Sequence, residues 1–335
     1  MLLSRERLLV LLNALYYCGT ENIELSYPPV DMIFYIDLKK KEARAISSKE
    51  YGKKLSEFKE KLGKDVDPVC ISELPNSNAL KDCLYISGVL KPKNISEIET
   101  ELIQLAKKDP MKGDRLLLIG FDTNALRRRV NIYIQKILIE NRLKARFCHS
   151  SLIFDELFRQ YDKKLPYEWY PPEALSFMKN FSNQSIRDAR LARLGAVEYK
   201  KLKDVHSQEV KGDDSKDNPD LKIVKSYESL KTENDLLLIS GDKNFHDIAQ
   251  AKGMKIIEVK EPHEVPSSIP ISWEGACDLI FVAAVCFGMI NVNGVKVYGV
   301  WGGKDVNNWN KEELKIEIEG GSKIKLDRFN RIISD

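Results

Sequence analysis

Two short apolar runs constrain the fold of this chain more than any other feature. Residues 116–119 are all leucine or isoleucine, and residues 236–239 have the same composition. A strand that is apolar at every position is typical of a parallel sheet covered on both faces, because an exposed face would carry alternating polar residues. The second run is followed by a helical pattern at residues 245–251 and by an apolar segment at 254–259. This order predicts a right-handed strand–helix–strand unit and therefore an α/β domain.

Carboxylates follow both apolar runs. Asp122 comes three residues after the first run, and Asp242 comes three residues after the second. Functional groups of open α/β sheets collect at the carboxyl ends of the strands. A single aspartate after a strand is often only a turn residue or a helix cap. Two of them, in the same context, favour a shared functional site over two caps.

Two further acids are candidates for the same site. Glu156 lies near the start of a predicted helix at residues 150–157, and its neighbour Asp155 is an alternative. Asp188 opens a predicted helix at residues 187–199, where the helix dipole alone would also favour an acid. Carboxylates packed together repel one another, and Mg²⁺ or Mn²⁺ relieves this repulsion by binding their oxygens. A bound cation also activates water for attack on a phosphodiester, so the four acids predict a metal-dependent hydrolase.

The segments that carry these acids resemble PIN domains. The resemblance covers residues 116–259 and rests on four segments in order along the chain. Residues 118–126, with Asp122-Thr-Asn124, look like the opening strand of the family. The second and third acids of the family correspond to residues 151–157 and 187–199, and residues 239–245 are similar to its closing Ser/Thr-x-Asp-x-Asp-Phe pattern.

The resemblance implies a three-layer α/β/α domain with a central parallel sheet and the activity of a metal-dependent endoribonuclease. The domain would span residues 113–262, with a charged insertion near residues 204–230 that is exposed and mobile at 211–220. Asn244 stands where many members of the family have another aspartate. Mg²⁺ or Mn²⁺ would be bound by Asp122, Glu156, Asp188 and Asp242, supported by the polar side chains of Thr123, Asn124, Ser240 and Asn244.

Basic residues near the acids are candidate contacts to an RNA substrate. The net charge of +3 is too small to identify a partner, so any RNA-binding surface must come from local clustering. A run of charges is usually only a solvated face. The candidates are Arg127, Arg128, Arg187, Arg190, Arg193 and Lys243.

The flanking segments carry no chemical motif. Residues 1–112 are predicted to form an N-terminal α/β domain with short strands at 69–72 and 83–87, and residues 263–335 a helix followed by a small β extension. Either addition would suit a homo-oligomer or a protein partner. The six cysteines form no CxxC pair, and the apolar stretch at 278–291 is too short to span a bilayer, so it is predicted to be a buried helix. These features favour a cytoplasmic protein without a membrane segment.

Two other functions use the same residues. Residues 241–254 also look like the late Gly-Asp-x-x-x-x-Asp motif of haloacid-dehalogenase-type phosphatases. That family ends its first strand in Asp-x-Asp, and here the second position is Asn124, which cannot act as a general acid. With Asn244 in place of an acid, the domain could instead be an inactive PIN scaffold that binds RNA or protein.

Overall fold

The protein divides into two compact units, each built from separate stretches of the chain. The computed structural model describes residues 1–62, 68–108, 110–161, 163, 185–204, 207–212 and 218–317. The first unit comprises Met1–Leu90, Lys163–Arg190 and Glu264–Asp335, and the second comprises Lys91–Asp162 and Leu191–His263. Both ends of the chain therefore belong to one unit, whereas the sequence suggested an N-terminal domain and a separate C-terminal extension.

The first unit contains an eight-stranded antiparallel sheet in the order β1-β13-β12-β11-β2-β3-β4-β10. Strands from the two ends of the chain alternate in it: β11 pairs with β2, and β13 pairs with β1. These hydrogen bonds join the described part of the C-terminal segment, up to Glu317, to the N-terminal strands in one sheet. The strands are β1 (Leu2–Ser4), β2 (Asn22–Tyr27), β3 (Asp31–Asp37), β4 (Glu42–Ala45), β10 (Ile269–Pro270), β11 (Met289–Val292), β12 (Val295–Tyr298) and β13 (Glu313–Glu317).

The helices of the first unit include the buried helix predicted from the long apolar stretch. This is α13 (Trp273–Phe287), in which every residue from 276 to 287 is buried. The predicted strands at 69–72 and 83–87 are wrong, because residues 69–72 lie in one helix and residues 83–86 form the end of another, capped by Ser87. A short apolar run does not distinguish a strand from a buried helix by periodicity alone. The other helices are α1 (Arg5–Tyr17), α2 (Ser48–Leu62), α3 (Pro68–Ser72), α4 (Asn78–Ile86) and α14 (Val306–Asn310).

The second unit is built on a five-stranded parallel sheet in the order β7-β6-β5-β8-β9. The two apolar runs form its central strands, which pair from Leu117 with Asp235 to Phe121 with Ile239. All five residues of β5 are buried, so the parallel sheet predicted from these runs is confirmed. The strands are β5 (Leu117–Phe121), β6 (Ala145–Ser150), β7 (Gln208–Val210), β8 (Asp235–Ser240) and β9 (Lys255–Glu258).

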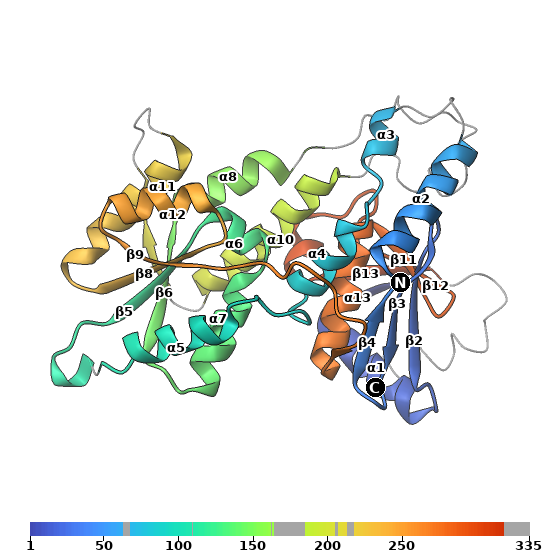
Figure 1. Cartoon of the computed structure of the whole chain (residues 1–335), viewed down its shortest axis with the longest axis horizontal. Helices are drawn as coiled ribbons and strands as arrows, with labels where there is room; N and C mark the ends of the chain where they lie inside the picture. Colours follow the sequence, from blue (N-terminus) through green and yellow to red (C-terminus); the bar gives the residue numbers. More distant parts are fainter. Residues whose placement is uncertain are drawn as a thin grey trace. The chain divides into compact units, whose positions relative to one another are not determined.

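Helices flank this sheet (Figure 1). The helix α10 begins in the first unit and continues into the second. The predicted insertion at 204–230 is wrong in its second half, because Ile223, Val224 and Tyr227 belong to the hydrophobic core. Residues 213–217 of that insertion lie outside the described residues. The helices are α5 (Ile95–Leu105), η1 (Pro110–Lys112), α6 (Thr123–Arg127), α7 (Val130–Glu140), α8 (Ser151–Tyr161), α10 (Arg187–Asp204), α11 (Pro219–Glu228), η3 (Ser229–Thr232) and α12 (Lys243–Ala251).

Within the described ranges, no helix combines the length and the apolar character that crossing a bilayer requires. The longest of the apolar helices, α13, has 15 residues.

Candidate active site

The parallel sheet reverses its strand order at one point. The chain adds β6 and β7 on one side of β5, and then returns to add β8 and β9 on the other side. Ligands of open parallel sheets bind outside the carboxyl ends of the strands at such a switch point. Asp122 directly follows β5, and Asp242 follows β8 after one glycine. Both predicted acids therefore lie where the topology favours a binding site.

Ser240 links the two acids. Its side chain is fully buried at the end of β8, and its Oγ donates a hydrogen bond to Asp122 Oδ2 at 2.6 Å. The same Oγ accepts a hydrogen bond from the backbone N–H of Asp242 at 2.8 Å. A hydroxyl group donates once and accepts twice, so both bonds form together. Asp122 and Asp242 are thus connected through a single buried hydroxyl.

Each acid also caps the helix that follows its strand. Asp122 Oδ1 accepts a hydrogen bond from the backbone N–H of Ala125 at 2.6 Å, at the start of α6. Asp242 Oδ1 accepts one from the backbone N–H of Asn244 at 2.8 Å, at the start of α12. An ionised carboxylate has about four lone-pair positions, so a cap leaves capacity for a further partner. Capping and ligand binding are compatible roles for both residues.

The environment of Asp122 disfavours the ionised form of its carboxyl group. Only 3% of the residue is exposed, and burial is the main reason that the pKa of Asp122 rises to about 7. The nearby carboxylates of Asp242 and Asp220 raise the pKa further, whereas the hydrogen bonds from Ser240 and Ala125 oppose the rise. Burial and like charge both disfavour the ionised form, and a bound cation would reverse this preference.

Asp220 is the site residue that the sequence analysis missed. It lies in the first turn of α11, where Asn218 caps the helix and Pro219 occupies its first position. Its Oδ2 accepts a hydrogen bond from Asn244 Nδ2 at 2.8 Å, and its negative charge contributes to the raised pKa of Asp122. The signal was present in the sequence, because Asn-Pro-Asp is a typical helix start. Its position in a charge-rich stretch led to its assignment to an exposed insertion.

Glu156 lies next to the aspartate pair but is engaged with another residue. Its Oε2 accepts a hydrogen bond from Thr123 Oγ1 at 2.6 Å, and Thr123 directly follows Asp122. The competing acid Asp155 is exposed. Asn124 Nδ2 donates to Asp242 Oδ2 at 3.3 Å, which is a long hydrogen bond. The predicted polar residues therefore contact the predicted acids, with Glu156 held by Thr123.

The division of the chain assigns Asp188 to a different unit from the other acids. Asp188 lies in the first turn of α10, in the stretch that belongs to the first unit. Asp122, Glu156, Asp220 and Asp242 all belong to the second unit. Within the second unit, Asp220 is the acid that joins Asp122 and Asp242 in the site described here.

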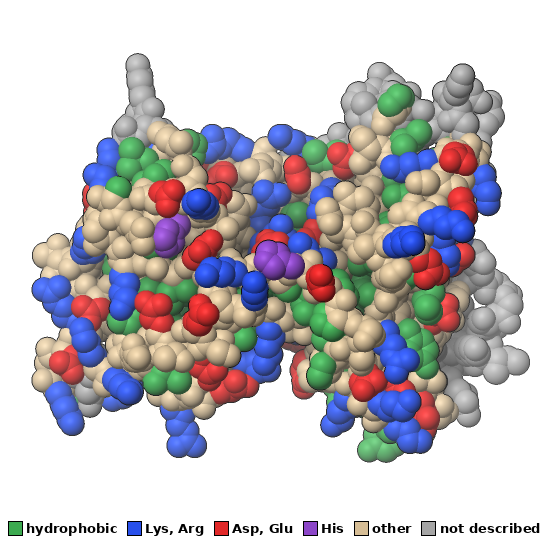
Figure 2. All heavy atoms as spheres, viewed as in Figure 1, with side chains coloured by type: hydrophobic (Ala, Val, Ile, Leu, Met, Phe, Trp, Pro, Cys, Tyr) green, Lys and Arg blue, Asp and Glu red, His purple; other side chains and the backbone are tan. Residues whose placement is uncertain are grey.

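Three of the predicted RNA-binding residues are buried or bound to other groups of the protein. The side chain of Arg187 donates a hydrogen bond to Asp82, and Arg190 is only 2% exposed, so Arg190 has no surface to offer to RNA. Arg193 donates to the backbone oxygen of Tyr161 at 2.9 Å and lies 4.0 Å from the centre of its ring. On the face drawn in Figure 2, basic and acidic side chains are interspersed and form no single basic patch.

Three of the basic residues lie close in the chain to Asp122 or Asp242. Arg128, which follows α6, forms an ion pair with Glu261 at 3.2 Å, and Arg127 is half-buried in α6. Lys243 is exposed and directly follows Asp242. Of the six candidates, Lys243 is therefore the one whose exposure and position suit a phosphate beside the acids.

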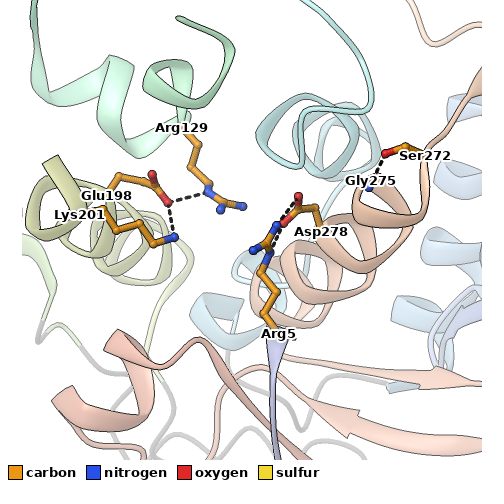
Figure 3. Close-up of polar contacts among 7 residues, drawn as sticks. All are labelled: Arg5, Arg129, Glu198, Lys201, Ser272, Gly275 and Asp278. Carbon is orange, nitrogen blue, oxygen red and sulfur yellow. Dashed lines mark hydrogen bonds and ion pairs between the residues drawn. The ribbon is translucent and has the colours of Figure 1, made fainter. Parts of the chain in front are cut away.

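A buried ion-pair network fixes the helix that begins at Asp122. Arg129 and Glu198 are each 2% exposed at the side chain, and Arg129 Nε donates to Glu198 Oε1 at 3.0 Å (Figure 3). Asn131 donates to the other oxygen at 2.7 Å, and Lys201 approaches Oε1 at 3.1 Å. Arg129 adopts a left-handed φ of 55° between α6 and α7. The network therefore holds the junction that follows the Asp122 segment.

The oxygen donors suit a hard divalent cation, although they do not enclose one. Carboxylates and amide oxygens are the ligands that Mg²⁺ and Mn²⁺ prefer. Among the residues that the structure describes, no three His, Cys, Asp or Glu side chains already converge as a metal would require. The raised pKa of Asp122, which burial causes first and the carboxylates of Asp242 and Asp220 increase, is the observation that favours a cation here.

Comparison with protein-family models finds no match for this chain, and comparison with curated proteins finds none either.

Proposed function

We propose that the second unit is a metal-dependent ribonuclease that hydrolyses phosphodiester bonds. The observation that carries this proposal is the pair of Asp122 and Asp242, linked through Ser240 at the switch point of the parallel sheet. The resemblance of residues 116–259 to PIN domains supports the same activity. The assignment of the second unit to the PIN family rests on that resemblance alone.

Asp122, Asp220 and Asp242 are the residues that would hold Mg²⁺ or Mn²⁺. When bound, the cation supplies Lewis acidity to the phosphoryl oxygens and lowers the pKa of a bound water. The buried Ser240 hydroxyl fixes the orientation of Asp122, and the Asn244 amide fixes that of Asp220. Preorganised ligands of this kind avoid rearrangement during the reaction.

The remaining polar residues have supporting roles in this proposal. Glu156, held by Thr123, is the acid available to accept a proton from the attacking water or to complete the ligand set. Lys243 is exposed next to Asp242 and would offset the charge of a substrate phosphate. Asn124 would orient Asp242 through its amide.

The test is cleavage of a labelled single-stranded RNA pool with Mn²⁺, with Mg²⁺ or with EDTA. We expect cleavage with a metal, none with EDTA, and loss of cleavage in Asp122→Asn and Asp242→Asn. Asp247→Asn is the matched control, because Asp247 is an exposed aspartate of α12, the helix that Asp242 caps. For the second acid, Glu156→Gln is compared with its exposed neighbour Asp155→Asn. Cleavage that resists EDTA, or that persists in Asp122→Asn, would contradict the proposal.

One observation supports an inactive scaffold as the second candidate. The amides of Asn124 and Asn244 already donate to Asp242 and Asp220, at 3.3 Å and 2.8 Å. These bonds partly neutralise the carboxylates without a cation. Calorimetric titration with Mn²⁺ separates the two cases: no binding, together with no cleavage of RNA, of DNA or of a phosphate monoester, favours the scaffold. Turnover of the monoester alone would instead favour a phosphatase.

A further inference from the structure

An apolar cavity lies inside the first unit, between α1 and the antiparallel sheet. Its volume is about 240 Å³. Its walls are aliphatic side chains from α1, from α13 and from the strands β2, β11, β12 and β13, among them Leu12, Ile280, Val297 and Leu314. The polar lining residues are Cys18, Thr20 and Asn293. Because Cys18 and Asn293 are exposed, these residues mark the mouth of the cavity.

Two contacts hold α1 on α13 and so keep the helix from closing onto the sheet. Near the start of α1, Arg5 forms a two-pronged ion pair with Asp278, in which Nη2 donates to Oδ2 at 2.9 Å (Figure 3). Near its end, the ring of Tyr16 meets the ring of Trp273 edge-on, with centroids 5.3 Å apart. A helix fixed near both ends cannot collapse into the space beneath its middle. The cavity is therefore a property of the packing and not of a loosely placed helix.

The chemistry of the walls excludes water and charged ligands from the interior. A buried water requires two to four polar partners, and the aliphatic walls offer none. At the mouth, the amide of Asn293 is already used, because its Oδ1 accepts from the backbone N–H of Glu24 and its Nδ2 donates to the backbone oxygen of Asn22. Among the residues that the structure describes, the lining includes no charged side chain. A ligand with a charged head would thus lose its hydration without gaining a partner.

We propose that this cavity binds a neutral molecule with an aliphatic chain. An empty apolar cavity destabilises a protein in proportion to its volume, so a molecule that fills the cavity stabilises the fold. This cavity is larger than the roughly 150 Å³ engineered cavity that binds benzene. At about 30 Å³ for a group the size of water, it accommodates about eight methylene-sized groups. The Thr20 hydroxyl at the mouth can hydrogen-bond a neutral polar head.

The test is calorimetric titration of the full chain with 1-octanol and with octanoate, which differ in head-group charge. We expect saturable binding of 1-octanol, at least about tenfold weaker binding of octanoate, and a higher midpoint of tryptophan-monitored thermal unfolding with 1-octanol. Trp273, Trp301 and Trp309 all report on the first unit. Absence of saturable 1-octanol binding would overturn the proposal. Equal binding of octanoate would overturn the assignment of a neutral head.

Two variants show whether binding occurs in the cavity. Val297→Phe places a ring in its interior, and we expect the affinity for 1-octanol to fall more than tenfold. Val10→Phe is the matched control, because Val10 lies on α1 with 57% exposure and does not line the cavity. If Val297→Phe does not fold, Thr20→Trp blocks the mouth and replaces it in the comparison. Wild-type affinity in a folded cavity variant would overturn the proposal.

Discussion

Neutralising Glu198 should destabilise the second unit without directly changing the candidate site. Burial alone would raise the pKa of Glu198, but the charges of Arg129 and Lys201 and the hydrogen bond from Asn131 outweigh it and lower the pKa to about 2. Relative to the ordinary glutamate pKa of 4.5, this corresponds to about 3 kcal/mol of stabilisation at neutral pH. Because glutamine resembles the protonated acid, Glu198→Gln should lose about that amount. Loss of a buried ion pair typically costs about 3–5 kcal/mol, which agrees.

Urea unfolding measures this loss. Trp273, Trp301 and Trp309 belong to the first unit, so their fluorescence follows that unit while far-UV circular dichroism follows both units. At typical slopes of about 1–3 kcal/mol per molar urea, the dichroism midpoint of the second unit should fall by about 1–3 M. The fluorescence midpoint should stay in place. Lys201→Met is the control, because the Lys201 side chain is 40% exposed and its loss should cost at most about 1 kcal/mol.

The same network sets a pH dependence. An acid whose pKa is lowered by folding stabilises the protein above its unfolded pKa, and that stability is lost as the pH falls towards the folded pKa. For Glu198 the loss falls between about pH 4.5 and pH 2. In Glu198→Gln, this part of the acid unfolding should be absent. If the free energy of unfolding of Glu198→Gln lies within about 1 kcal/mol of the wild-type value, the reasoning is refuted.

Three other predictions concern the site and the sheet beneath it. Folding raises the pKa of Asp122 from 3.8 to about 7, so its ionisation destabilises the metal-free fold as the pH rises through 7. With EDTA at pH 8, Asp122→Asn should therefore be more stable than the wild type by up to about 4 kcal/mol in urea unfolding, and by less at pH 5; Mn²⁺ should stabilise only the wild type. Asp220→Asn should lower the affinity for Mn²⁺, measured by calorimetry, at least tenfold, whereas Asp188→Asn should bind Mn²⁺ as the wild type does. The opposite ranking would favour Asp188 as the third acid. A Cβ on Gly120 would lie 2.9 Å from side-chain atoms of Leu238 and Tyr227, so Gly120→Ala should lower thermal stability by about 1–3 kcal/mol. Gly52 lies in α2, where a Cβ would meet no atom within 4 Å, so Gly52→Ala should instead raise the stability by about 0.5–1 kcal/mol. Equal effects of the two changes would exclude the steric explanation.

The features that the sequence predicted correctly depend on short stretches of chain. Residues 116–119 and 236–239 are buried strands because each run is apolar at every position, and this can be read without knowing their neighbours. The positions of Asp122 and Asp242 then follow from parallel pairing, which brings the carboxyl ends of both strands to one edge. The eight-stranded sheet of the first unit could not be predicted in this way. It joins β2 to β11 across more than 260 residues, and no local pattern encodes such a pairing.

The contrast between Asp220 and Asp188 has a similar physical origin. Both open helices, and each is equally well explained as a first-turn acid that suits the helix dipole. What separates them is which strand follows. The helix α11 leads through η3 into β8 and packs on α12, so its first turn reaches the edge of the sheet at which Asp242 lies. The acid that precedes the second central strand is therefore the better candidate, although it lies in the more polar segment.

Asn244 acquires a different meaning in this arrangement. From the sequence, it marks the loss of a carboxylate from the closing pattern of the site. In the structure its Nδ2 donates to Asp220 Oδ2, and its backbone N–H donates to Asp242 Oδ1. An aspartate at this position would face Asp220 with a like charge and would have no proton to donate at neutral pH. Asp122, Asp220 and Asp242 thus share this edge of the sheet with Glu156, and the asparagine orients Asp220 where a further acid would add repulsion.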